Sequence, residues 1–185
     1  MAQPEESLHA RYGRRAGWLR HHLAATLNRL GAFEPLTRIR WHDVRRLVFV
    51  CQGNICRSAY AEARAKALGL RAASFGLGAH EGDRANPTAL ARAAARGVDL
   101  LPHRASSLSP ALPGDLLVAM EPAQVARLAK RTTAPLTLLG LWAAPARPHL
   151  EDPYGLSEAY FDTCFEVIDA AIVRIARLAP GTRNG

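Results

Sequence analysis

The sequence predicts an α/β domain with a doubly wound, mostly parallel four-stranded sheet and helices on both faces. Continuous apolar runs of strand length, such as Leu47–Val50, are flanked by charged residues, which is typical of a buried parallel strand. These runs alternate at short spacing with segments of helical periodicity. The length of 185 residues fits one such domain with a short extension at one end.

The strands are expected where apolar residues run without interruption. The segments 47–50 and 115–120 have the length and composition of buried strands. The segment 73–75 is expected to be a short strand, and 136–141 is expected to be extended. Ligands of such sheets bind beyond the carboxyl ends of the strands, so the turn after residue 50 is the expected place for chemistry.

The helices are expected from apolar periodicity and from residues that begin or end a helix. The first, at 16–30, carries leucines three or four residues apart and ends before Gly31. The others are expected at 58–68, 87–96, 122–130 and 157–178. Residues 143–156 contain three prolines and form a loop long enough to be functional.

The basic charge of the chain is concentrated near its N-terminus. The net charge is +8, and residues 1–46 contribute +5 of it, with nine arginines against four acidic residues. The remainder is nearly balanced and has no basic and aromatic platform, so nucleic acid is not an expected partner. We therefore divide the chain into a basic extension with an amphipathic helix (1–45), a globular domain (46–180) and a short tail (181–185).

Three roles remain open for the helix at 16–30. It could pack on the domain, dock on an anionic membrane surface, or dock on a protein partner. The expected compartment is the cytoplasm, because three cysteines are too few for the disulfide framework of a secreted protein. No apolar run approaches the roughly 20 residues that span a bilayer, and the first thirty residues lack a secretory signal pattern.

The segment Cys51–Ser58 joins the first strand to the first helix of the domain. A loop of this length points successive backbone N–H groups at one centre, and the helix N-terminus adds a positive dipole end, so a phosphate-sized anion fits there. The same groups favour the thiolate of Cys51, which makes it the candidate nucleophile. Arg57 offers a planar fork of donors that matches two phosphate oxygens.

The other residues of the loop have supporting roles in this hypothesis. Gly53 is expected to supply unusual backbone dihedrals, and Asn54 tolerates the left-handed conformation. The Ser58 hydroxyl could cap the helix or donate a hydrogen bond to the thiolate. The candidate phosphate-binding residues are Gln52, Gly53, Asn54, Ile55, Cys56, Arg57 and Ser58.

The segment Val48–Ser58, Val-Phe-Val-Cys-Gln-Gly-Asn-Ile-Cys-Arg-Ser, resembles the signature of the low-molecular-weight protein tyrosine phosphatases. Further resemblances to that family lie at Ser74–Leu77, Gly97–Asp99, His103–Ala105 and Asp152–Tyr154. The resemblance covers roughly residues 46–179 and leaves out 1–45. It implies a phosphomonoester hydrolase that acts on a phosphotyrosine-containing protein or a small aryl phosphate.

A thiolate that attacks a phosphate ester needs a proton donor for the departing oxygen. The resemblance assigns this role to Asp152 in the loop before the last helix, with Glu151 as the neighbouring rival. The implied mechanism is covalent: Cys51 attacks phosphorus, Arg57 and the loop amides hold the oxygens, and Asp152 serves as acid and then as base. No metal or other cofactor is expected, because the loop itself supplies the positive charge.

The resemblance also implies roles for residues around the loop. Cys56 would form a reversible disulfide that protects Cys51, although it could equally be a packed thiol. Tyr154 resembles the aromatic wall that the family places against a phenyl ring. His103 resembles a histidine that braces Asn54. The loop at 78–82 has no aromatic residue where many relatives place one beside the site.

Two other readings compete with a phosphatase. An arsenate reductase of the same fold needs downstream cysteines to carry electrons, and only Cys164, expected in the core, follows the loop. A phosphate-binding regulatory module without turnover would not need Cys51, Arg57 and Asp152 together. Relatives that prefer phosphoarginine carry Thr at the position of Ile55, which argues against that substrate.

Overall fold

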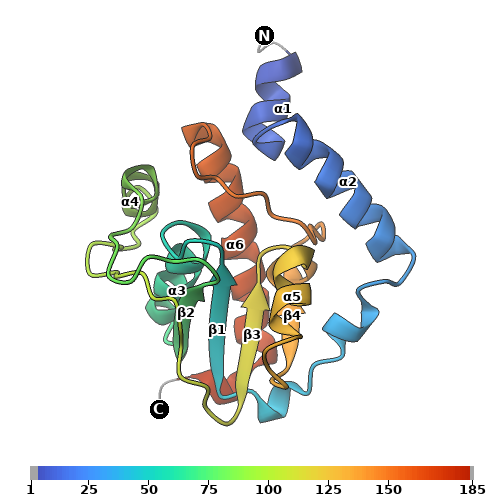
Figure 1. Cartoon of the computed structure of the whole chain (residues 1–185), viewed down its shortest axis with the longest axis vertical. Helices are drawn as coiled ribbons and strands as arrows, with labels where there is room; N and C mark the ends of the chain where they lie inside the picture. Colours follow the sequence, from blue (N-terminus) through green and yellow to red (C-terminus); the bar gives the residue numbers. More distant parts are fainter. Residues whose placement is uncertain (1–3, 184–185) are drawn as a thin grey trace.

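The computed structural model describes residues 4–183 and has a central sheet of four parallel strands in the order β2-β1-β3-β4 (Figure 1). The strands are β1 (Arg46–Cys51), β2 (Ala72–Gly76), β3 (Asp115–Ala119) and β4 (Leu136–Leu138). Every pairing is parallel. The predicted doubly wound α/β class is therefore confirmed.

The chain order of the strands places a switch point beside β1. The connection from β1 leads outward to β2, and the connection from β3 leads the opposite way to β4. In register, Val50 of β1 aligns with Phe75 of β2 and with Ala119 of β3. The carboxyl ends of β1 and β3 therefore meet where the winding direction changes, which is where such sheets bind ligands.

The helices of the domain cover both faces of the sheet. They are α3 (Arg57–Ala67), α4 (Pro87–Ala94), α5 (Pro122–Leu128) and α6 (Glu158–Leu178). Right-handed crossovers put α3 and α5 on opposite faces, because their connections run in opposite directions. The helix α6 packs beside α3 on one face, and α5 covers β3 and β4 on the other (Figure 1).

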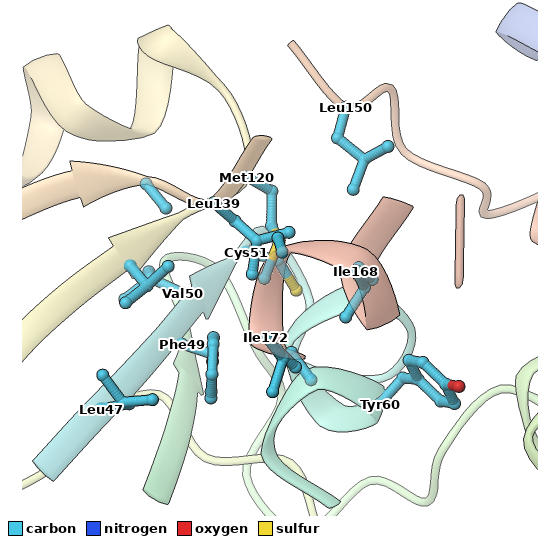
Figure 2. Close-up of a cluster of buried hydrophobic side chains, with 14 of the residues drawn as sticks. Leu47, Phe49, Val50, Cys51, Tyr60, Met120, Leu139, Leu150, Ile168 and Ile172 are labelled. Carbon is cyan, nitrogen blue, oxygen red and sulfur yellow. The ribbon is translucent and has the colours of Figure 1, made fainter. Parts of the chain in front are cut away.

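The core on the α3 and α6 face fixes the end of β1. Leu47, Phe49 and Cys51 share one face of β1 because side chains alternate along a strand. Figure 2 shows these residues in one buried cluster with Ile168 and Ile172 of α6. The Tyr60 ring of α3 stacks on Phe165 of α6, with centroids 3.7 Å apart. Cys51 therefore leaves the strand on the side where α3 begins.

The expected extended segment at 136–141 is only partly correct. The strand ends at Leu138, and Leu139–Trp142 forms a 3-10 turn. The turn brings Gly140 against the loop that follows it, where Arg147 N–H donates to the Gly140 carbonyl at 2.7 Å. An ideal Cβ at position 140 would lie 1.7 Å from the Arg147 carbonyl oxygen, so only glycine fits. The loop at 143–156 contains no helix or strand, as expected.

The N-terminal extension packs along the domain rather than standing apart from it. The extension forms α1 (Pro4–Tyr12), which was not predicted from the sequence, and α2 (Arg15–Arg29), whose two ends each lie one residue from those of the helix expected at 16–30. Thr163 of α6 donates to the Ala10 carbonyl at 2.8 Å, and Thr137 of β4 donates to the Leu36 carbonyl at 2.7 Å. Within residues 4–183, no helix has the length and apolar character needed to cross a membrane.

The packed face of α2 is not its leucine face. Gly17 and Ala24 are the buried residues of α2. The leucine stripe, which we define as Leu19, Leu23, Leu27 and Leu30, is 38 to 77% exposed. At position 17 a larger residue has no room, because an ideal Cβ there would lie 2.2 Å from the Tyr12 carbonyl oxygen and 3.1 Å from Glu151 Cγ.

Glu151 joins the extension to the domain through a buried ionic cluster. Its side chain is 3% exposed, and its carboxylate accepts hydrogen bonds from Arg14 Nε at 2.7 Å and from Arg20 Nη1 at 3.0 and 3.1 Å. His149 Nε2 lies 2.9 Å from the same carboxylate. Burial raises the pKa of Glu151, but the hydrogen bonds from His149, Arg14 and Arg20 outweigh burial and lower it to about 2.

Replacing Glu151 by Gln tests this cluster through the pH dependence of stability. Because the folded-state pKa lies below the unfolded one, ionised Glu151 stabilises the fold above the unfolded pKa, and this stabilisation is lost as the pH falls toward the folded value. We expect the difference in unfolding free energy between wild type and Glu151→Gln, measured by urea titration, to shrink by about 1 kcal/mol from about pH 7 to about pH 3.5. A difference that is the same at both pH values would contradict the ionic role of Glu151.

Candidate active site

The site is built on the loop between β1 and α3, which begins at Cys51 and ends at Ser58. The strand ends at Cys51 and the helix begins at Arg57, so strand, loop and helix N-terminus follow each other as predicted. The loop lies at the carboxyl end of β1, beside β3. A pocket of about 330 Å³ opens over it.

The carbonyl groups of this loop are bound from outside. Leu77 N–H donates to the Cys51 carbonyl at 3.0 Å, and Gly78 N–H donates to the Gln52 carbonyl at 2.9 Å. Asn86 N–H donates to the Ile55 carbonyl at 2.9 Å.

The outward carbonyls determine where the amides point. Because C=O and N–H point in opposite directions across a trans peptide, each outward carbonyl turns the next N–H toward the loop centre. The N–H groups of Gln52, Gly53 and Cys56 are turned in this way. The geometry is that of an anion-binding nest at a helix N-terminus.

Asn54 is the residue that allows the loop to turn so tightly. It has a φ of 54°, whereas Gly53 has no positive φ, so the expectation that Gly53 supplies the unusual dihedrals is wrong. Asn54 is fully buried, and its amide nitrogen donates to Ser74 Oγ at 2.7 Å and to Ser58 Oγ at 2.9 Å. These hydrogen bonds hold a left-handed conformation that Asn tolerates better than most residues.

Two further contacts brace Asn54. His103 Nε2 lies 2.7 Å from its carbonyl oxygen, which is the contact that the resemblance implied. Ser106 N–H donates to its side-chain oxygen at 2.9 Å. At Gly76, an ideal Cβ would lie 2.7 Å from the Gln52 carbonyl oxygen and 2.8 Å from Asn54 N, so the end of β2 must be glycine for the loop to fit.

Cys51 lines the pocket, and two polar groups lie within hydrogen-bond distance of its sulfur. Asn54 N–H donates to Cys51 Sγ at 3.2 Å, and Ser58 Oγ lies 2.9 Å from Sγ. The helix N-cap is Cys56 and makes no side-chain cap hydrogen bond. Of the two roles left open for Ser58, its position fits the hydrogen bond to the sulfur of Cys51.

The other two cysteines have different surroundings. Cys56 is 2% exposed and lines the same pocket as Cys51, and both are free thiols. Burial, assisted by the charge of Asp152, raises the pKa of Cys56 far above its ordinary value. Cys164 is fully buried in α6, and burial raises its pKa to about 12. Both groups are therefore protonated thiols at neutral pH.

Arg57 is a fully buried guanidinium at the edge of the site. Its Nη1 donates to the Leu150 carbonyl at 2.7 Å and lies 3.5 Å from Glu121 Oε1. Burial lowers the pKa of Arg57, but the neighbouring acidic groups, Asp152 first among them, raise it above its ordinary value. Among the described residues, Nε of Arg57 has no hydrogen-bond partner, which leaves a buried donor for an anion.

Asp152 and Tyr154 lie across the pocket from the loop. Asp152 Oδ2 is 2.6 Å from Arg57 Nη2, and its side chain is 33% exposed. Tyr154 is 65% exposed and lines the pocket with Asp152. Glu151, the rival acid, is turned away from the pocket into its cluster with Arg14 and Arg20.

Several residues in and around the pocket were not predicted from the sequence. His80 and Asp83 line the pocket from the loop after β2. They could have been predicted because they follow the strand that pairs with β1, and the carboxyl ends of parallel strands lie at the same edge of a sheet. Arg14 and Arg20 gave no local signal, because their partner lies more than a hundred residues away in the sequence.

Comparisons with known proteins agree with this geometry. Residues 46–179 match the family model described as low molecular weight phosphotyrosine protein phosphatase. A probable low molecular weight protein-tyrosine-phosphatase, EpsP of Ralstonia nicotianae, is 32% identical over 143 residues, which cover 73% of this chain and 99% of that protein.

Solved structures give the same result. The tyrosine phosphatase AmsI of Erwinia amylovora is 31% identical with a TM-score of 0.64, and the match covers 72% of this chain and 92% of that one. The tyrosine phosphatase Wzb of Escherichia coli K30, solved in complex with sulphate, is 27% identical with a TM-score of 0.66, covering 72% and 97%. Because the family model matches most of the chain and a relative that is 32% identical is covered over almost its whole length, this chain belongs to the low-molecular-weight protein tyrosine phosphatase family.

Proposed function

We propose that this protein hydrolyses phosphotyrosine in proteins, or small aryl phosphates, through a phosphocysteine on Cys51. The observation that carries the proposal is that the Cys51 sulfur accepts from Asn54 N–H in a loop whose carbonyls are bound from outside, and that the guanidinium of Arg57, at the end of this loop, is fully buried. Developing negative charge on the phosphoryl oxygens is stabilised most by donors that are already oriented. The candidate phosphate-binding residues 52–58 belong to this proposal.

The first step transfers the phosphoryl group to sulfur. The Cys51 thiolate attacks phosphorus, the ester P–O bond breaks, and its electron pair stays on the departing oxygen. Asp152 gives that oxygen a proton, so the product leaves as a neutral phenol.

The second step returns the enzyme to its starting state. Water attacks phosphorus, the S–P bond breaks, and its electron pair returns to Cys51 as the thiolate. Asp152, now ionised, takes the proton from the water. Inorganic phosphate is released, and no oxidant, reductant or metal takes part.

The pocket supports an aromatic leaving group. The ring of Tyr154 stands exposed at the rim, where it can pack against a phenyl ring. Ile55 also lines the pocket and adds apolar surface. An arsenate reductase would have to pass electrons to a further accessible cysteine, and Cys164 is fully buried.

We also propose bounds for the catalytic domain and a cellular compartment for the protein. We place the phosphatase domain at residues 46–180 and its tail at 181–185, with 1–45 as an added element. A cytoplasmic location fits a thiolate nucleophile that has a second thiol, Cys56, in the same loop, because only a reducing compartment keeps both free. A reversible Cys51–Cys56 disulfide would then protect the nucleophile from oxidation.

Replacing Asp152 by Asn tests the general acid. We expect kcat/KM to fall about tenfold for p-nitrophenyl phosphate and about a hundredfold or more for phenyl phosphate, because only the poorer leaving group needs the proton at departure. Steady-state assays of both substrates measure this. Cys51→Ser, the matched control for the nucleophile, is expected to abolish turnover of both; near wild-type activity in Cys51→Ser would contradict the covalent mechanism.

A membrane surface is the partner that the exposed face of α2 supports best. The leucine stripe stays largely exposed, although Leu23 and Leu27 face Pro122 and Ala123 of the domain across a shallow pocket, and Trp18 of the same helix is 41% exposed. The helix α2 contains three arginines, two histidines and no acidic residue. We propose that this face docks on an anionic lipid surface, since apolar side chains flanked by cations are typical of interfacial helices.

Vesicle co-sedimentation tests this docking. We expect the full chain to sediment with phosphatidylglycerol vesicles and not with phosphatidylcholine vesicles, and the double substitution Leu19→Ser and Leu23→Ser to weaken the partition about tenfold. Leu101→Ser, at a leucine that is 70% exposed on the domain, is the matched control and should have no effect. Absence of sedimentation with either lipid would exclude the membrane and leave a protein partner for this face.

A further inference from the structure

The segment His149–Asp152 is held from two opposite sides. On the domain side, Arg57 Nη1 donates to the Leu150 carbonyl at 2.7 Å, and Nη2 lies 2.6 Å from Asp152. Leu150 itself is fully buried in the core drawn in Figure 2. On the other side, the Glu151 carboxylate faces the extension.

The extension side of this arrangement consists of two guanidinium groups on one carboxylate. Arg14 places Nε at 2.7 Å and Nη2 at 2.5 Å from Oε1 of Glu151, and Arg20 Nη1 contacts both oxygens. A carboxylate that is 3% exposed would be costly to bury without such partners. Both arginines remain about half exposed, so they reach Glu151 from the surface.

The close approach of α2 to this segment depends on Gly17. An ideal Cβ at position 17 would lie 3.1 Å from Glu151 Cγ and 2.2 Å from the Tyr12 carbonyl oxygen. The helix α1 is in turn anchored on α6 by Thr163, which donates to the Ala10 carbonyl at 2.8 Å. In Figure 1, α1 and α2 (blue) lie beside the orange segment that leads into α6.

We infer that Arg14 and Arg20 are positioning residues for Asp152. By binding the Glu151 carboxylate from the side opposite Arg57, the extension fixes the segment His149–Asp152, which we call the acid segment, against Arg57. This inference rests on the proposed role of Asp152 as general acid. Glu151 and Asp152 are adjacent, so a shift of the Glu151 backbone moves the acid directly. The family match begins at residue 46, so both positioning residues lie outside the matched domain.

In this arrangement the extension affects protonation of the leaving group by Asp152 and does not affect phosphate binding. Leu77, Gly78, Asn86 and His103, which hold the loop at 51–58 by hydrogen bonds, all belong to the domain and not to the extension. Loss of the arginines should therefore leave the nucleophile and the amides in place. It should weaken only protonation of the leaving group, which a good leaving group does not need.

The test compares two substrates in the full chain. We expect the double variant Arg14→Gln, Arg20→Gln to lose about tenfold in kcat/KM for phenyl phosphate and less than about threefold for p-nitrophenyl phosphate. The competitive inhibition constant of inorganic phosphate should stay unchanged. Arg29→Gln, which replaces an exposed arginine of the same helix, is the matched control and should change neither substrate.

Two further variants keep the test decisive. Glu151→Gln, which is neutral and similar in shape, should give the same substrate-selective loss even where the double variant folds poorly. Arg14→Lys with Arg20→Lys should restore part of the loss, because the charge returns without the planar fork.

The outcomes separate this inference from the proposed function. An equal loss for both substrates, or no loss in a folded variant, would overturn the positioning role. If Asp152→Asn is selective for phenyl phosphate and the arginine variants are not, the inference fails alone. If Asp152→Asn shows no selectivity, the proposed acid fails with it.

Discussion

The outward orientation of the carbonyls in the loop at 51–58 is the constraint on which the rest of the site depends. An amide can point at an anion only if its neighbouring carbonyl points away, and each such carbonyl needs a donor of its own when it is buried. The loop after β2 supplies two of these donors, Leu77 and Gly78, and Asn86 before α4 supplies another. Strand order therefore sets the chemistry, because β2 must lie beside β1 for these contacts to form.

Arg57 connects this loop to the acid segment. It starts α3, so its backbone belongs to the anion site, while its side chain reaches the Leu150 carbonyl and Asp152 across the pocket. One buried cation thus fixes the distance between the nucleophile and the acid. The extension adds a second cationic contact on the far side of the same segment, through Glu151.

The sequence could predict the elements and the loop because their signals are local. Uninterrupted apolar runs predicted β1 and β3. The short turn between the first strand and the first helix of the domain, which begins at Cys51, predicted the position of the site. The failures have a common cause in long-range packing. The leucine stripe left open whether α2 packs on the domain; the buried residues are instead Gly17 and Ala24, and Gly17 lies against Glu151, which is distant in sequence. The unusual dihedrals were expected at Gly53, whereas Asn54, expected to tolerate the left-handed conformation, is the residue that adopts it, because its side chain finds buried partners in Ser74 and Ser106.

The central claim is that the thiol of Cys51 receives the phosphoryl group. Rapid acid quench of the enzyme during turnover of p-nitrophenyl phosphate, followed by mass spectrometry of its peptides, tests this claim most directly. We expect a single added phosphoryl group on the peptide that contains Cys51, localised to that sulfur by fragmentation, and its loss in Cys51→Ser. Turnover with no phosphorylated cysteine at any quench time, or with the phosphoryl group on Cys56, would contradict it.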